Sequence, residues 1–178
     1  MYDDAAYHRL ARQPGGEPAV NRFDYRGAFW FPVEPNELWD TIERFDQFES
    51  WWAWLRDFGA DSDRLVAGNV LHATVIPPVP YRLALDIRLE GSLRPHVLEA
   101  TIDGDARGFA VIRLDPVDDG TQVAVLWSLG MVSTPLRIAA LVAYPLMRWG
   151  HDRVVEMAVA GFRQQALAGT RDGGPGER

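Results

Sequence analysis

The sequence predicts an α+β fold in which an antiparallel sheet is followed by a long helix. Between residues 65 and 132, apolar and polar side chains alternate with a period of two, which is typical of strands with one buried face. Over residues 135–168 the apolar period becomes that of a helix. With one strand and two short helices before the alternating region, we expect about six to seven strands packed against the C-terminal helix.

The early strand and the two short helices are predicted near the N-terminus. Aromatic residues alternate with others over residues 24–31, which indicates a strand. Pro35 suits the first turn of a helix over residues 35–42, whose apolar side chains share one face. A second helix is predicted over residues 46–55, where three tryptophans lie close together.

The alternating region is interpreted as an antiparallel meander. Glycine, aspartate and proline residues separate the apolar runs at the places where hairpin turns are needed. The alternation also predicts which face of each strand is buried, because a shift of one residue would reverse every side chain. The predicted strands cover residues 65–76, 81–90, 96–103, 109–115 and 122–132.

A chain of 178 residues is expected to form one domain. Residues 1–21 are polar and contain Pro and Gly, so we expect a flexible N-terminal arm. Residues 22–168 are expected to form the folded domain, and the glycine-rich residues 169–178 a disordered tail. Pro145 is expected to kink or split the final helix, because an interior proline loses a backbone hydrogen bond.

Composition excludes several classes of function. The formal net charge is −7 and no basic run is present, so nucleic acid is not expected as a partner. The sequence has no cysteine, which excludes disulfides, thiolate nucleophiles and Cys-ligated metals. No apolar stretch of signal-peptide length occurs in the first 20 residues, so a cytoplasmic location is expected.

The apolar run over residues 138–147 is too short to span a bilayer, which needs about 20 residues. Arg137 and Arg148 bracket this run, so a buried helix or an interfacial contact fits it better. Membrane contact is therefore expected to be transient at most, and the oligomeric state is left open.

Four features of the sequence resemble the START-like, or SRPBCC, superfamily, in particular its polyketide cyclase/dehydrase and lipid-transport members. These are a strand leading into Val33–Trp39, the aromatic helix of residues 48–52, Gly104 and Gly108 flanking a hairpin before Asp119–Thr121, and the amphipathic final helix. The resemblance covers residues 22–168. It implies a helix-grip fold, in which a curved sheet wraps the C-terminal helix around a cavity for a hydrophobic molecule.

Five residues are the candidates for lining this cavity. His96 has the parity of Leu98 in its predicted strand, which suggests an inward direction, and the parity of Trp127 also places it inward. His151 lies at the edge of the buried stripe of the final helix. The alternative to ligand contact is, for each histidine, a ring that is hydrogen-bonded by neighbouring groups or solvent. For Trp127 the alternative is ordinary core packing. The candidates are His72, His96, Trp127, Met147 and His151.

The chemistry of catalysis is weakly represented. The four histidines have no metal-ligand spacing, no serine lies in a nucleophile-elbow motif, and no nucleotide-binding fingerprint occurs, so neither a metal nor a cofactor is expected. The first hypothesis is therefore a noncatalytic binder or carrier of a lipid or polyketide-like molecule. The alternatives are an aromatase/cyclase-type enzyme that uses His151 as acid or base, and a lipid-transfer protein that docks transiently on membranes.

Overall fold

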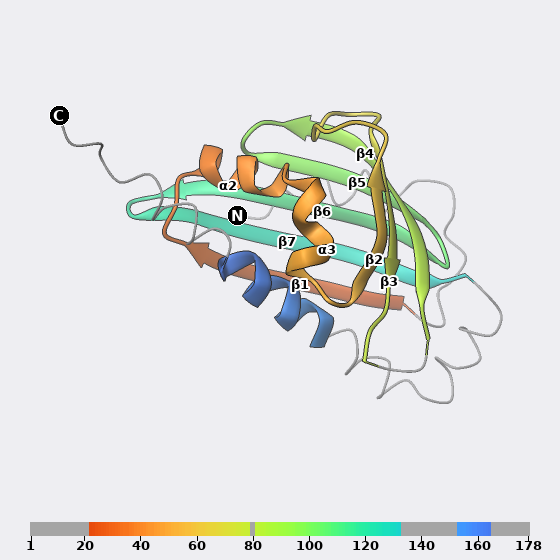
Figure 1. The fold of residues 1–178 in the computed structure, drawn as a ribbon. Helices are drawn as coiled ribbons and strands as arrows, with labels where there is room; N and C mark the ends of the chain where they lie inside the picture. The colour runs from red at the N-terminus through yellow and green to blue at the C-terminus, as the bar shows by residue number, and fades with distance from the viewer. Residues whose placement is uncertain (1–21, 79–80, 133–152, 165–178) are drawn as a thin grey trace.

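A computed structural model describes residues 22–78, 81–132 and 153–164 (Figure 1). Its centre is a seven-stranded antiparallel sheet in the order β1-β7-β6-β5-β4-β3-β2. The curved sheet carries α2, α3 and the helix of residues 153–164 on the same side (Figure 1). The strands are β1 (Arg22–Phe31), β2 (Leu55–Ala60), β3 (Val70–Val75), β4 (Leu83–Leu93), β5 (Val97–Gly104), β6 (Ala106–Val117) and β7 (Gly120–Met131). The predicted α+β architecture is confirmed.

Helix α2 (Pro35–Ile42) has the bounds that the sequence predicts. Pro35 begins it, and its buried side includes Leu38 and Trp39, which pack on the sheet. The second predicted helix is shorter than expected. It consists of a 3₁₀ turn, η1 (Phe45–Gln47), and one helical turn, α3 (Phe48–Trp51).

Strand β2 lies where no strand is predicted from the sequence. Its pairing with β3 shifts between Arg56 and Gly59, and Asp57 has a φ of 50°. This irregularity interrupts the alternation of faces along the strand, so residues 55–60 show no period of two. The predicted 46–55 helix consequently ends earlier, and Leu55 pairs with Val75.

The hairpin between β4 and β5 also differs from its prediction. The predicted strand ends at residue 90, but β4 continues to Leu93. A register shift between Leu89 and Gly91 accommodates Gly91 within the strand. The turn itself lies further along the chain, closed by the His96 amide, which donates to the Leu93 carbonyl at 2.6 Å.

The main core lies between α2 and the face of the sheet that we call the inner face. Its buried residues join Leu38 and Trp39 of α2 to strand residues that include Leu114, and Phe162 packs against the same cluster. The outer face is mostly polar, apart from a small apolar cluster of Phe109, Val111 and Leu126. The expected inward parity of β4, β5 and β7 is confirmed by the buried members of the core: Leu83, Leu85, Leu89, Leu98, Ala100, Ile102 and Val123.

The helix of residues 153–164 is joined to α3 and β1 by a short seam. Trp52 Nε1 donates to the Ala158 carbonyl at 3.1 Å, and Phe162 meets Phe31 edge-on with ring centroids 5.5 Å apart. The guanidinium of Arg163 lies over the Phe31 ring at 5.6 Å. The expected kink at Pro145, the N-terminal arm and the tail lie outside the described residues.

Candidate functional site

The middle of the inner face combines small and aromatic residues in one row across four strands. Ala100 of β5 pairs with Ala110 of β6, Ala110 pairs with Trp127 of β7, and Trp127 pairs with Tyr25 of β1. Directly paired residues point to the same side of a sheet. The row therefore has small side chains on β5 and β6, and aromatic side chains on β7 and β1. Gly108 lies in the next row, paired with Leu129.

The aromatic end of this row is a stacked pair. The rings of Tyr25 and Trp127 have centroids 4.4 Å apart and planes inclined by 22°. Tyr25 lies along β1 over Gly27, because a Cβ atom added to Gly27 would overlap with the Tyr25 hydroxyl oxygen. Glycine at position 27 therefore allows Tyr25 to lie against the strand and stack on Trp127.

Burial varies along the inner face. Leu114 and Val123 beneath α2 are buried, as are Phe23, Leu85 and Ile102 towards the other end of the strands. Between them, other apolar side chains on the same face are only half-buried and keep accessible surface. These are Tyr25, Phe29, Ile87, Ala110, Ile112, Val125, Trp127, Leu129 and Met131. An accessible apolar surface on the inner side of a curved sheet is suited to a hydrophobic ligand.

The inner face is also uncharged. No inner-facing position of the described strands carries an acid, an arginine or a histidine. Tyr81, which packs beside Phe23 and Met131, contributes a hydroxyl at one end of this face. Burial raises the pKa of Tyr81 above its ordinary value, so this hydroxyl is neutral at physiological pH.

His72 lies on the outer face, contrary to the prediction that it lines a cavity. Leu71 and Ala73 are buried and pair with Ile87 and Leu85 of the inner face, so the intervening His72, which pairs with Asp86, points the other way and is exposed. Its Nδ1 is 2.7 Å from Asp86 Oδ1, and its Nε2 is 3.5 Å from Asp61 Oδ1. These hydrogen bonds, the one with Asp86 first, raise the pKa of His72. An outward imidazole cannot contact a ligand on the inner face.

His96 also differs from its prediction. The sequence predicts it in a strand with the parity of Leu98, but β5 begins at Val97 and His96 is an exposed residue of the preceding turn. Its Nδ1 lies 3.1 Å from the Leu114 carbonyl oxygen. The turn reorients the backbone one residue before the alternation begins, and the ring is satisfied by backbone instead of facing inward.

Of the other predicted residues, Trp127 lies on the inner face in the row described above. Met147 and His151 lie outside the described residues. Tyr25 and Ala110 belong to the row but were not among the residues predicted to line a cavity. An alternation of Tyr25, Gly27 and Phe29 was visible in the sequence, but only the strand register shows that Tyr25 lies beside Trp127.

Comparison with known proteins identifies the fold. No family model matches the sequence, and no curated protein matches it. The TTHA0849 protein from Thermus thermophilus matches with a TM-score of 0.67 at 12% identity, over 83% of this chain and 99% of that one. The ZhuI aromatase/cyclase from Streptomyces sp. R1128 matches with a TM-score of 0.66 at 10% identity, over 86% and 98%. The chain has a START-like, helix-grip fold.

A third structural neighbour is Ara h 8.0201, with a TM-score of 0.58 at 12% identity over 83% of this chain and 97% of that one. At identities this low, the likeness establishes the fold alone. In this START-like chain, the inner face described above is the surface that the sheet presents towards the helix of residues 153–164, since Phe162 packs into its core.

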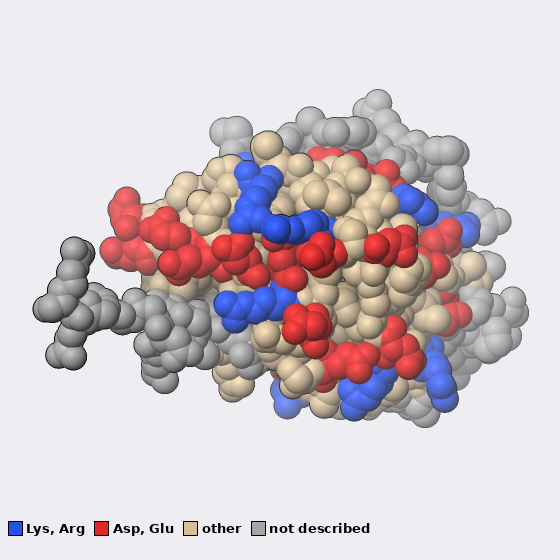
Figure 2. Space-filling model, turned by 45° about the horizontal axis from the view of Figure 1, so that its top comes forward, with Lys and Arg blue, Asp and Glu red and all other residues tan. Residues whose placement is uncertain are grey.

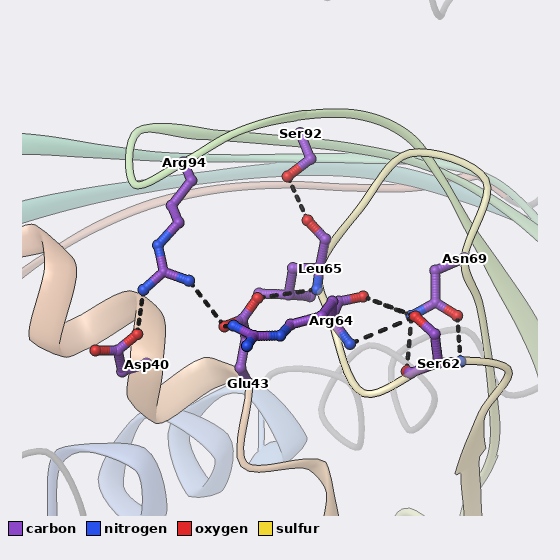
Figure 3. Close-up of polar contacts among 8 residues, drawn as sticks. All are labelled: Asp40, Glu43, Ser62, Arg64, Leu65, Asn69, Ser92 and Arg94. Carbon is purple, nitrogen blue, oxygen red and sulfur yellow. Dashed lines mark hydrogen bonds and ion pairs between the residues drawn. The ribbon is translucent and has the colours of Figure 1, made fainter.

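A polar network closes the α2 end of the START-like domain (Figure 3). Glu43, whose side chain is 12% exposed, accepts hydrogen bonds from Arg94 at 3.0 Å and from the Leu65 amide at 3.1 Å. Arg94 also pairs with Asp40, and the Ser92 hydroxyl donates to the Leu65 carbonyl. The network fastens the β2–β3 connection and the β4–β5 turn to α2.

Acidic and basic side chains are interspersed on the surface drawn in Figure 2, with red groups gathered towards one end. Several of the opposite charges are paired, as in the contact of Arg64 with Glu43. Within the described residues, no group of three or more His, Cys, Asp or Glu side chains is arranged to hold a metal ion. None of the described helices is both long and apolar enough to cross a bilayer.

Proposed function

We propose that this protein binds or carries a hydrophobic small molecule, of lipid or polyketide-like type, between the inner face of its sheet and the C-terminal helix. The observation that carries the proposal is the row formed by the buried Ala100 and the half-buried Ala110, Trp127 and Tyr25. Small residues leave room above the sheet, and the stacked rings offer a flat apolar wall.

Burial of apolar surface supplies the affinity in this proposal. At about 25 cal/mol per Å², about 300 Å² of buried apolar surface contributes about 7.5 kcal/mol before the costs of association are subtracted. Trp127 is a proposed contact, together with Tyr25 and Ala110. Met147 and His151 remain predicted contacts from the final helix.

A binder or carrier is favoured over an aromatase/cyclase-type enzyme by the chemistry of the inner face. General acid–base catalysis needs a titratable group within hydrogen-bond reach of the reacting atoms. The inner-facing positions of the described strands hold no His, Asp or Glu, and His72 and His96 point away. Of the predicted acid–base candidates only His151, outside the described residues, would remain, beside the hydroxyls of Tyr25 and Tyr81. Transient membrane docking is a further possibility for loading a lipid, and it would use the run over residues 138–147.

The test begins with native mass spectrometry of the protein purified from its own host, followed by extraction of any bound molecule. We expect a stoichiometric hydrophobic adduct. In parallel, the neutral fluorophore N-phenyl-1-naphthylamine is titrated into extracted protein, where we expect saturable fluorescence enhancement that the extracted molecule reverses. A clean unliganded mass together with no fluorophore binding would overturn the proposal.

A further inference from the structure

Trp39 holds a hydrogen-bond donor in the main core without an acceptor. Its side chain is 0% exposed, and its indole Nε1 atom has no hydrogen-bond partner. The core cluster to which it belongs consists of apolar residues, from Phe31 of β1 to Leu114 of β6. A buried N–H group without an acceptor costs folding free energy, so native proteins seldom keep one without a reason.

Two other tryptophans in the described residues provide a contrast. The indole of Trp52 donates to the Ala158 carbonyl at 3.1 Å. Trp54 also has a buried, unpartnered Nε1, but it lies in a separate cluster with Phe48 and Leu55 beneath α3. Only Trp39 belongs to the core cluster that contains Ala100, and Ala100 begins the row that leads through Ala110 to Trp127.

We propose that Trp39 Nε1–H is the donor that recognises the ligand, and that the ligand therefore carries an uncharged acceptor oxygen such as a ketone or ester carbonyl. The inference rests on the proposed function. The apolar body of the ligand lies over Ala110 and against Trp127, with its oxygen directed towards Trp39. The oxygen is uncharged because no inner-facing position of the described strands offers a cation to pair with a carboxylate.

The test compares two probes of nearly equal size, 2-acetylnaphthalene, which has a carbonyl, and 2-ethylnaphthalene, which has none. Their dissociation constants are measured for the wild type, Trp39→Phe and Trp54→Phe. The substitution Trp39→Phe keeps an aromatic ring and removes the N–H. We expect the preference for the ketone to fall about five- to tenfold in Trp39→Phe, as expected for one hydrogen bond. Trp54→Phe, which removes the other unpartnered indole, should keep the preference.

The possible outcomes test the inference separately from the proposed function. If the ratio of the two dissociation constants is the same in wild type and Trp39→Phe, the inference alone is overturned. The inference alone is also overturned if the preference for the ketone is lost in Trp54→Phe and kept in Trp39→Phe. No binding of either probe by any form overturns the proposed function together with the inference.

A second measurement uses only the wild type, in case Trp39→Phe does not fold. The ¹⁵N–¹H signal of the Trp39 indole, assigned by through-bond experiments, should move downfield with 2-acetylnaphthalene. It should not move downfield with 2-ethylnaphthalene. Equal shifts with the two probes would contradict the inference.

Discussion

Tyr25 and Trp127 are a directly paired cross-strand couple whose rings stack at 4.4 Å on the inner face. They lie far apart in the chain, on β1 and β7. Ala110, paired with Trp127 from the other side, is a small neighbour for the indole on that side of the row. The small side chain of Ala110 beside the stacked rings of Tyr25 and Trp127 leads to the first prediction.

Ala110→Leu should abolish binding of N-phenyl-1-naphthylamine without lowering the melting temperature. The larger side chain would fill the space that the ligand is proposed to occupy. If that space were instead packed core, the substitution would cost about 1–3 kcal/mol of stability. Ala28→Leu is the matched control, since Ala28 is exposed on the outer face of β1. Fluorescence titration and thermal unfolding check both variants.

Gly161→Ala should destabilise the protein, although alanine is the better helix former by about 1 kcal/mol. A Cβ atom at position 161 would lie 2.9 Å from Trp52 Nε1 and 3.1 Å from the Trp51 carbonyl oxygen. The indole is held by its hydrogen bond to Ala158, so it cannot yield freely. Urea unfolding should show a net loss of about 1 kcal/mol or more. An increase in stability would mean that the seam is loose.

Glu43→Ala should cost more stability than Asp40→Ala. Glu43 is largely buried and serves Arg94, Arg64 and the Leu65 amide, so its removal leaves a buried donor unpaired, at about 1–3 kcal/mol. Asp40 contributes one exposed ion pair to Arg94, for which we expect about 0.5 kcal/mol or less.

Hydrogen exchange measures the local effect of the same two substitutions. The Leu65 amide should lose protection in Glu43→Ala and keep it in Asp40→Ala. Equal effects of the two substitutions would show that Glu43 does not hold the β2–β3 connection.

The pair of His72 and Asp86 should make a pH-dependent contribution to stability. Because hydrogen bonds to Asp86 and Asp61 raise the folded pKa of His72 above 6.5, the contribution is fully present below the unfolded pKa. It is lost as the pH rises through the raised folded value. The stability lost in Asp86→Asn should therefore be larger at about pH 5.5 than at about pH 8.5. An NMR titration of His72 should show its pKa falling in Asp86→Asn.

Much of the fold could be predicted because it depends on local patterns. Helix α2 has the predicted bounds, since Pro35 and one apolar face are local signals. The buried parity of β4 likewise follows from alternation alone. Strand β2 could not be found this way, because its bulge at Asp57 removes the alternation on which the prediction depends.

The candidate site was less accessible to prediction than the fold. His72 and His96 were chosen as polar residues near predicted inward positions, and both are exposed. One lies on the other face of its strand, and the other lies in a turn. A single-residue error in the start of a strand reverses the direction of a side chain. The histidine predictions were sensitive to that error, whereas the apolar stripes were not.

The sequence by itself determined the period of each element, the buried face of most strands, the negative charge and the absence of cysteine chemistry. Only the tertiary structure decided which residues meet. The register of β1, β5, β6 and β7 brings Tyr25, Ala100, Ala110 and Trp127 into one row, and packing of α2 buries the Trp39 indole without an acceptor. The reason is physical: periodicity reports each segment's own burial, while register and packing depend on contacts between segments far apart in the chain.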